Sequence, residues 1–227
     1  MAMATTTEGA RTWRGPAINR RAGVFALLAV LALVVGAAVF VYGMIPRPPD
    51  GDSAEAGFLR DMSDHHAQGV EMALILHDRT ADAGLLTMTT DIAMTQQGQI
   101  GAMQGWLDVW DISPTGDDPK MAWMDHPIKD GLMPGMATPE QLAQLETLPV
   151  DQAEVLFLQL MIRHHQGGVD MAEALLDRSE QQEVTTFARG VVTSQSSEIE
   201  TMNGMHEARG QTPITDPLPT DDSHTQH

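Results

Sequence analysis

Two stretches of the sequence decide the fold: residues 58–73 read FLRDMSDHHAQGVEMA, and residues 157–172 read FLQLMIRHHQGGVDMA. They align without a gap when the chain is shifted by 99 residues, and the similarity continues to Gly105 in the first copy and Gly204 in the second. Both stretches have apolar residues at helical spacing. A duplicated helical hairpin is therefore predicted, and two such hairpins packed together form an all-α four-helix bundle.

The composition narrows the range of functions. The chain of 227 residues has a formal net charge of −18, and residues 1–46 contain four arginines against one glutamate, so the acidity lies in the rest of the chain. An acidic body argues against binding to nucleic acid, which requires a basic face. The sequence has no cysteine, which excludes disulfides, zinc fingers, iron–sulfur ligation and thiol catalysis. Methionine is abundant at sixteen residues.

Residues 22–45 contain no charged side chain and predict a transmembrane helix. At about 1.5 Å per residue the segment spans roughly 36 Å, which exceeds a hydrocarbon core of about 30 Å. Arg20 and Arg21 precede it, so the positive-inside rule places residues 1–21 in the cytoplasm and the acidic body outside the cell membrane. The alternative is a cleaved signal peptide, but the apolar run is longer than usual and ends without a clear cleavage site.

The remaining boundaries follow from composition. Residues 46–56 are rich in Pro, Gly and Asp and predict a linker. The bundle domain is placed at 57–209, with a first repeat at 57–110, a connection at 111–138 and a second repeat at 139–209. Thr138 followed by Pro139 is typical of a helix start. Residues 210–227 predict a disordered tail.

A helical wheel places the recurring residues on one apolar stripe, with the paired histidines facing inward or lying at its rim. The same wheel places Asp61, Gln68 and Glu71 on the outward arc. Gly69 and Gly168 lie on the stripe, where glycine costs about 1 kcal/mol relative to alanine. They predict either close helix packing or room for a ligand.

Imidazole suits copper, zinc, iron and nickel, whereas thioether sulfur selects soft ions such as Cu(I). The stripe therefore predicts a copper ion held by nitrogen and sulfur ligands. Because a ligating histidine must be neutral, occupancy is expected to fall below about pH 6.5. The candidate metal ligands are His65, His66, His164, His165, Met62, Met72, Met161 and Met171, with Met202 and His206 as an accessory site.

Other interpretations stay open. A di-iron centre needs Glu-x-x-His, which does not occur, and the repeated carboxylates Glu71 and Asp170 face outward. The histidines are alternatively structural, bonded to each other or to Gln96 and Gln195. The methionines of the connection form either an outer metal site or a cover over the bundle end. The residues of these weaker candidates are Met121, Met124, His126, Met133 and Met136 in the connection and His224 and His227 in the tail.

The doubled motif Met-x-x-His-His-x-x-Gly-x-x-Met-Ala, at Met62–Ala73 and Met161–Ala172, resembles the domain-of-unknown-function 305 family. Met133-Pro134-Gly135-Met136 before Thr138 is similar to that family's connection. The resemblance covers about residues 54–209. It implies a ferritin-like four-helix bundle that is secreted or membrane-attached, and it implies copper binding, since some members are associated with copper resistance outside the cytoplasm.

Three hypotheses follow. The first is a membrane-anchored extracytoplasmic protein that sequesters or relays copper. The second is a structural or interaction ectodomain with core histidines and no metal. The third is a metal-dependent redox enzyme. The sequence contains no nucleophile–base pair, phosphate-binding loop or dinucleotide motif that indicates another enzyme class.

Overall fold

The computed structural model describes residue 9 and residues 20–43, 47–128 and 131–218. Within these residues the secondary structure is helical, with no strand and one isolated bridge between Lys120 and Ile128. The helices are α1 (Arg20–Gly43), α2 (Ala54–His77), α3 (Ala83–Val109), the 3₁₀ helix η1 (Ala122–Met124), α4 (Pro139–Thr147), α5 (Val150–Leu176) and α6 (Gln182–Ala208). The predicted all-α fold is confirmed. The chain divides after Arg47 into two compact units.

The first unit contains helix α1. Its segment Gly23–Gly43 has 21 residues and a mean hydropathy of 3.0, and its large apolar side chains are exposed. At 1.5 Å per residue the segment measures roughly 32 Å, long and apolar enough to cross a membrane. The predicted end of the apolar segment at Ile45 lies outside the described residues.

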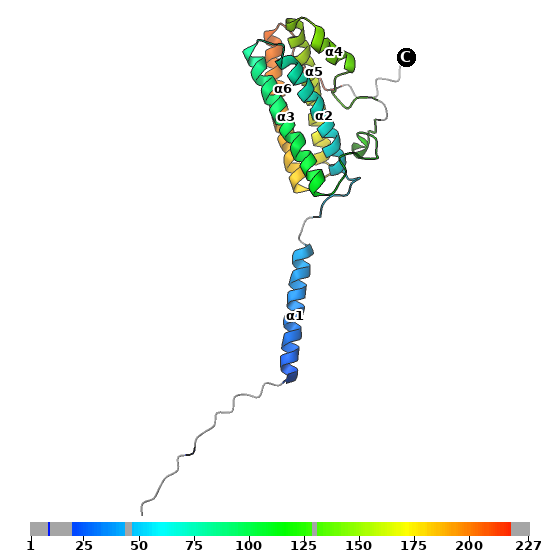
Figure 1. Ribbon diagram of the computed structural model, residues 1–227, viewed down its shortest axis with the longest axis vertical. Coiled ribbons are helices and arrows are strands. Elements are labelled where there is room, and N and C mark those ends of the chain that lie inside the picture. Colours follow the sequence, from blue (N-terminus) through cyan, green and yellow to red (C-terminus); the bar gives the residue numbers. More distant parts are fainter. Residues whose placement is uncertain (1–8, 10–19, 44–46, 129–130, 219–227) are drawn as a thin grey trace, which may run out of the picture. The chain divides into compact units, whose positions relative to one another are not determined.

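The second unit is the helical bundle. Figure 1 shows α2, α3, α5 and α6 running alongside one another. Helix α2 packs on α3 and α5 packs on α6, and the two hairpins meet along α2 and α5, with α4 against both of these helices. Side-chain caps begin several helices: Ser53 before α2, Asp82 before α3, and Thr138 in a capping box before α4.

The core of the bundle consists of two hydrophobic clusters at opposite ends. The first cluster joins the start of α2 to the end of α5, and it includes Met62 and Met171. The second joins the end of α2 to the start of α5, and it includes Met72 and Met161. Helices α2 and α5 are therefore antiparallel. Each of the four long helices contributes to both clusters, and the buried polar residues lie between them.

The connection between the hairpins packs over α2, and this corrects two predictions of the helical wheel. Asp61 and Gln68 are buried, not outward-facing. Asp61 accepts hydrogen bonds from the Met121 backbone N–H (2.7 Å) and the Trp123 indole (3.0 Å). Gln68 forms a reciprocal pair with Ala137, donating to its carbonyl (2.9 Å) and accepting from its N–H (2.7 Å). The wheel counts only one helix, so it misses burial by a loop.

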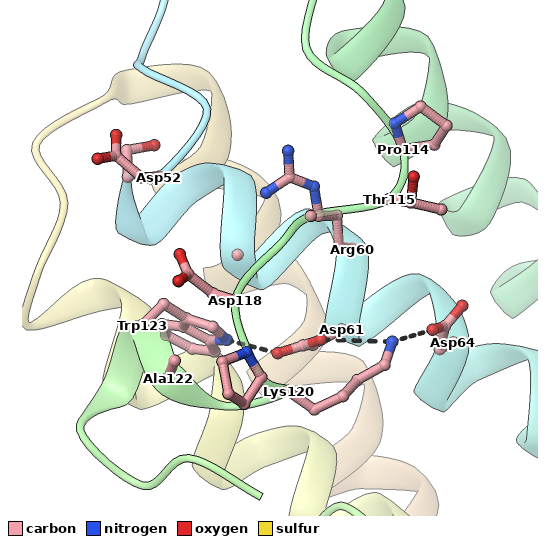
Figure 2. A pocket seen from close by; sticks show the side chains of 14 residues that line it. Asp52, Arg60, Asp61, Asp64, Pro114, Thr115, Asp118, Lys120, Ala122 and Trp123 are labelled. Atoms are coloured by element: carbon pink, nitrogen blue, oxygen red, sulfur yellow. Dashed lines mark hydrogen bonds and ion pairs between the residues drawn. The ribbon is translucent and has the colours of Figure 1, made fainter. Parts of the chain in front are cut away.

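A surface hollow lies between this connection and the start of α2. Figure 2 shows Asp61 between the Trp123 indole and the Lys120 ammonium, with Asp64 beyond Lys120. Arg60, also in the lining, donates to the backbone carbonyls of Gly51 and Ser113. Both cations of the hollow are thus engaged by the surrounding chain, so these contacts fasten the connection to α2.

Candidate metal centre

A polar layer separates the two hydrophobic clusters in the middle of the bundle. Its members are buried and come from all four long helices: His65 and His66 from α2, Gln96 from α3, His164 and His165 from α5, and Gln195 from α6. In each helix the layer residues fall between residues of the first cluster and residues of the second. The structure therefore brings the four predicted histidines into one layer.

The rings of His65 and His164 stack at the centre of the layer. Their centroids are 3.8 Å apart and their planes differ by 29°. Nε2 of His65 lies 3.0 Å from the Pro134 carbonyl oxygen, and Nε2 of His164 lies 2.8 Å from the carbonyl oxygen of His65. A carbonyl only accepts, so both Nε2 atoms carry the proton. In each neutral ring Nδ1 is then left with a free lone pair.

The second histidine of each pair bonds to the neighbouring helix of its own hairpin. Nε2 of His66 lies 2.7 Å from Oε1 of Gln99 on α3, and Nε2 of His165 lies 2.6 Å from Oε2 of Glu198 on α6. Gln99 and Glu198 are not among the site residues predicted from the sequence. The two positions are equivalent in the repeat, because they are 99 residues apart, but the repeat does not mark them as identical residues.

The expected bonds to Gln96 and Gln195 are wrong. Among the described residues, neither carboxamide has a hydrogen-bond partner for its oxygen or its nitrogen. A Cβ added at Gly69 would overlap Oε1 of Gln96 and lie 3.0 Å from Cε1 of His164, and a Cβ at Gly168 would overlap Oε1 of Gln195. Because neither glycine has a side chain, each leaves room for a carboxamide in the layer. This contact agrees with both interpretations of the glycines, close packing and room within the bundle.

Nδ1 of each of the four layer histidines is buried and has no hydrogen-bond partner in the described part of the chain. A buried polar atom without a partner costs roughly 1–3 kcal/mol. The lone pairs of four such nitrogens can be satisfied by water molecules that donate hydrogen bonds or by a metal ion. A protonated Nε2 bound to an oxygen is the arrangement that orients a histidine ligand for a metal ion.

Burial lowers the pKa of three of the layer histidines, His65, His66 and His164. It lowers the pKa of His65 to about 4, opposed by the hydrogen bond with Pro134. Burial, followed by the repulsion of His65, lowers the pKa of His66 to about 3. The same two causes hold the pKa of His164 well below its ordinary value of 6.5. Ligating histidine must be unprotonated, and these three histidines meet that condition well below neutral pH.

The candidate methionines border the layer on both sides without forming a single group. Met62 and Met171 belong to the first cluster, whereas Met72, Met161 and Met202 belong to the second. Met62 precedes the first histidine pair by one helical turn, and Met161 precedes the second pair in the same way. Each histidine pair thus has one methionine a turn before it on its own helix, and these two methionines lie on opposite sides of the layer.

His206 does not join the layer. It follows Gln195 by eleven residues on α6, about 16 Å along the helix axis. Its Nδ1 lies 3.1 Å from the Thr212 carbonyl, and its Nε2 is buried without a partner among the described residues. The beginning of the predicted tail is held against the bundle here, because Asn203 also forms a reciprocal pair with Ile214.

The weaker candidates lie apart from the histidine layer. The connection's methionines cover the first cluster: Met121 and Met133 are buried in it, and Met124 and Met136 pack against it. His126 is exposed. His224 and His227 lie outside the described residues. The positions favour the interpretation that these methionines cover the bundle end.

Over the described residues, no three side chains of His, Asp or Glu come together in a group able to hold a metal ion. The repeated carboxylates Glu71 and Asp170 are exposed, so they are not available as the bridging ligands that a di-iron centre in the layer requires. Besides the layer's histidines, the nearest buried sulfur donors along the helices are the thioethers of Met62 and Met161, one turn before each histidine pair. Such a donor set fits a soft ion such as Cu(I).

Comparison with known proteins agrees with this architecture. The model of the family described as Domain of unknown function (DUF305) matches residues 55–206. The chain belongs to the DUF305 family. The matched region contains the complete polar layer and the connection over α2. No curated protein matches the chain.

Solved DUF305 structures resemble the bundle along most of their length. A putative secreted DUF305 protein from Streptomyces coelicolor is 46% identical, with a TM-score of 0.69, covering 74% of this chain and 100% of its own. A DUF305 fragment from Deinococcus radiodurans is 35% identical, with a TM-score of 0.59, covering 72% and 99%. CopM in its Cu(I)-bound form is 24% identical, with a TM-score of 0.51, covering 69% and 96%, which shows a shared fold.

Proposed function

We propose that this DUF305 protein is a membrane-anchored, extracytoplasmic protein that binds copper ions in the polar layer of its bundle, for sequestration or relay. The observation that carries the proposal is the set of unpartnered Nδ1 atoms on the four layer histidines. Each of these rings is held through Nε2 by an oxygen acceptor, which is the arrangement that orients a histidine for ligation through Nδ1.

The choice of copper follows from the donors. Imidazole binds several transition metals, but thioether sulfur favours soft ions, and methionines border the layer on both sides. CopM has been crystallised with Cu(I), with Cu(II) and with Ag, and it supports the proposal through its fold. When bound, the ion supplies a soft Lewis acid, and the chain contributes neutral nitrogens, sulfurs and exclusion of water.

The location rests on helix α1. The uncharged segment Gly23–Gly43 has the length and composition of a membrane span. Arg20 and Arg21 precede it and favour a cytoplasmic N-terminus. The similar Streptomyces coelicolor protein is described as secreted, which agrees with a bundle outside the cytoplasm. A protein without cysteine suits that location, because methionine provides sulfur that does not form disulfides.

A purely structural role is the second candidate, and the stack of His65 on His164 favours it, because stacked neutral rings pack as core residues. The two roles differ in the need for a metal. In the structural role, the melting temperature of the metal-free protein does not change when Ag(I) is added.

The test is a metal titration of the full-length protein in detergent after removal of metal with a chelator. Met62→Leu combined with Met161→Leu keeps side-chain volume and removes two sulfurs, so stability should change by less than about 1.5 kcal/mol. We expect Cu(I) affinity to fall by about tenfold or more. Met88→Leu combined with Met121→Leu is the matched control in the same two clusters. Equal affinity in all three proteins contradicts the ligand assignment.

A further inference from the structure

The two histidine pairs occupy equivalent places but have different partners. In the first hairpin the Nε2 of His66 bonds to a carboxamide, that of Gln99, at 2.7 Å. In the second hairpin the Nε2 of His165 bonds to a carboxylate, that of Glu198, at 2.6 Å. Both pairs span 33 residues, and both histidine rings are fully buried with an unpartnered Nδ1. The two hairpins therefore place a neutral carboxamide and a charged carboxylate at equivalent positions beside their histidines.

Charge at this position alters the donor strength of the opposite ring nitrogen. A carboxylate accepts a hydrogen bond about twice as strongly as a neutral amide does. By drawing the Nε2 proton, Glu198 raises the electron density of the His165 ring and makes its Nδ1 the stronger donor. The negative charge also attracts a cation in the layer directly, and the surrounding protein screens it less than water would. Gln99 orients His66 without either effect.

The charge of Glu198 is directed to His165. Its side chain is 23% exposed, and in the described part of the chain no lysine or arginine forms an ion pair with it. By contrast Glu154, a partly buried carboxylate elsewhere on the bundle, is paired with Arg209. Glu198 is therefore available to balance a positive charge brought into the layer.

We propose that Glu198 is a positioning residue that makes the two halves of the layer unequal: the His165 half holds a metal ion more tightly than the His66 half, and the preference is greater for Cu(II) than for the monovalent ions Cu(I) and Ag(I). The inference rests on the proposed metal binding. The preference grows with the charge of the ion because the attraction to a carboxylate scales with that charge.

The chain provides its own matched variants. Glu198→Gln copies the first hairpin, Gln99→Glu copies the second, and the double variant exchanges the two partners. We expect Glu198→Gln to lower Cu(II) affinity by about 10–100-fold and Ag(I) affinity by less. Gln99→Glu should raise Cu(II) affinity. The double variant should recover the wild-type affinity, a rescue that a general packing effect does not produce.

A second readout does not require metal. In nitrogen-resolved NMR spectra of the metal-free full-length protein in detergent, the Nε2–H proton of His165 should resonate downfield of that of His66. Glu198→Gln should remove this difference, and the double variant should reverse it. A folded Glu198→Gln protein with unchanged Cu(II) affinity overturns the inference and leaves the proposed function standing. Failure of the wild-type protein to bind Cu(II) and Ag(I) overturns both.

Discussion

The imidazole rings of His65 and His164 lie face to face, 3.8 Å apart between centroids, although 99 residues separate them in the sequence. This contact joins the two hairpins at the middle of the α2–α5 seam, where each ring also uses its Nε2 on a backbone carbonyl. Two positive charges so close in a buried place repel strongly, so the two rings are not both protonated, and burial lowers the pKa of each. The stability of the bundle is thereby linked to pH.

Acid should destabilise the metal-free bundle. In the native layer the pKa of His65 is lowered to about 4 and that of His66 to about 3. Below pH 6.5 these two histidines therefore bind protons in the unfolded chain but not in the folded protein. The free energy of unfolding therefore has its full value above pH 6.5. It falls as pH decreases toward 4, by up to about 1.4 kcal/mol per pH unit for each such histidine. Denaturant unfolding of the full-length protein at several pH values measures the slope.

His66→Gln should reduce that slope, because it removes one group that titrates only after unfolding. His126→Gln, a change at an exposed position, should leave the slope as it is. A stability that does not change between pH 7 and pH 5 would contradict the buried neutral state. The lowered pKa values also change the expectation from sequence for the ion: copper occupancy should persist below pH 6.5.

Alanine at Gly69 should disturb the layer without a large loss of helix. Its Cβ would overlap the Gln96 carboxamide and press on the His164 ring at 3.0 Å. We expect Ag(I) affinity to fall, measured by competition titration. Gly101→Ala is the control, because nothing lies within 4 Å of the added Cβ. That variant should gain up to about 1 kcal/mol from helix propensity and keep its affinity. Equal affinities would separate Gly69 from metal binding.

Alanine at Gly167 should displace the connection from α5. Its Cβ would overlap the Pro134 carbonyl oxygen and lie 2.5 Å from the carbonyl carbon, and backbone cannot swing aside as a side-chain end does. Since Pro134 also accepts the hydrogen bond of His65, that bond should be lost with it. We expect a destabilisation of about 1–3 kcal/mol by denaturant unfolding. Gly190→Ala, with nothing within 4 Å, should be neutral or stabilising.

Removal of the buried Asp61 carboxylate should loosen the connection at the other end. Asp61→Ala leaves the Met121 N–H and the Trp123 indole without their acceptor, at a cost of about 1.5–3 kcal/mol. Limited proteolysis should then cut within residues 113–128. Asp64→Ala, at a side chain that is 62% exposed, should change stability by less than about 0.5 kcal/mol. Similar proteolysis of both variants would show that Asp61 does not fasten this segment.

The helices and the stripe on which the histidines lie could be predicted from local sequence patterns. The spacing of apolar residues over 58–73 and 157–172 reflects the geometry of a single helix. A cap such as Thr138 is likewise identified from the residues next to it in the chain. The bundle of two hairpins was predictable because the repeat is visible in the sequence. Duplication of the paired histidines then placed all four on inward faces.

The contacts of those histidines, by contrast, depend on how the two hairpins and the connection pack together. Gln99, Glu198 and the Pro134 carbonyl reach the layer from two other helices and from the connection, at separations that no helical wheel represents. The antiparallel packing of α2 on α5 also placed Met62 in the same cluster as Met171, and Met72 in the same cluster as Met161, so the methionines fall on two sides of the layer. A periodic pattern fixes the face of a residue, but the atoms opposite that face come from other elements, and their contacts form only when the hairpins pack.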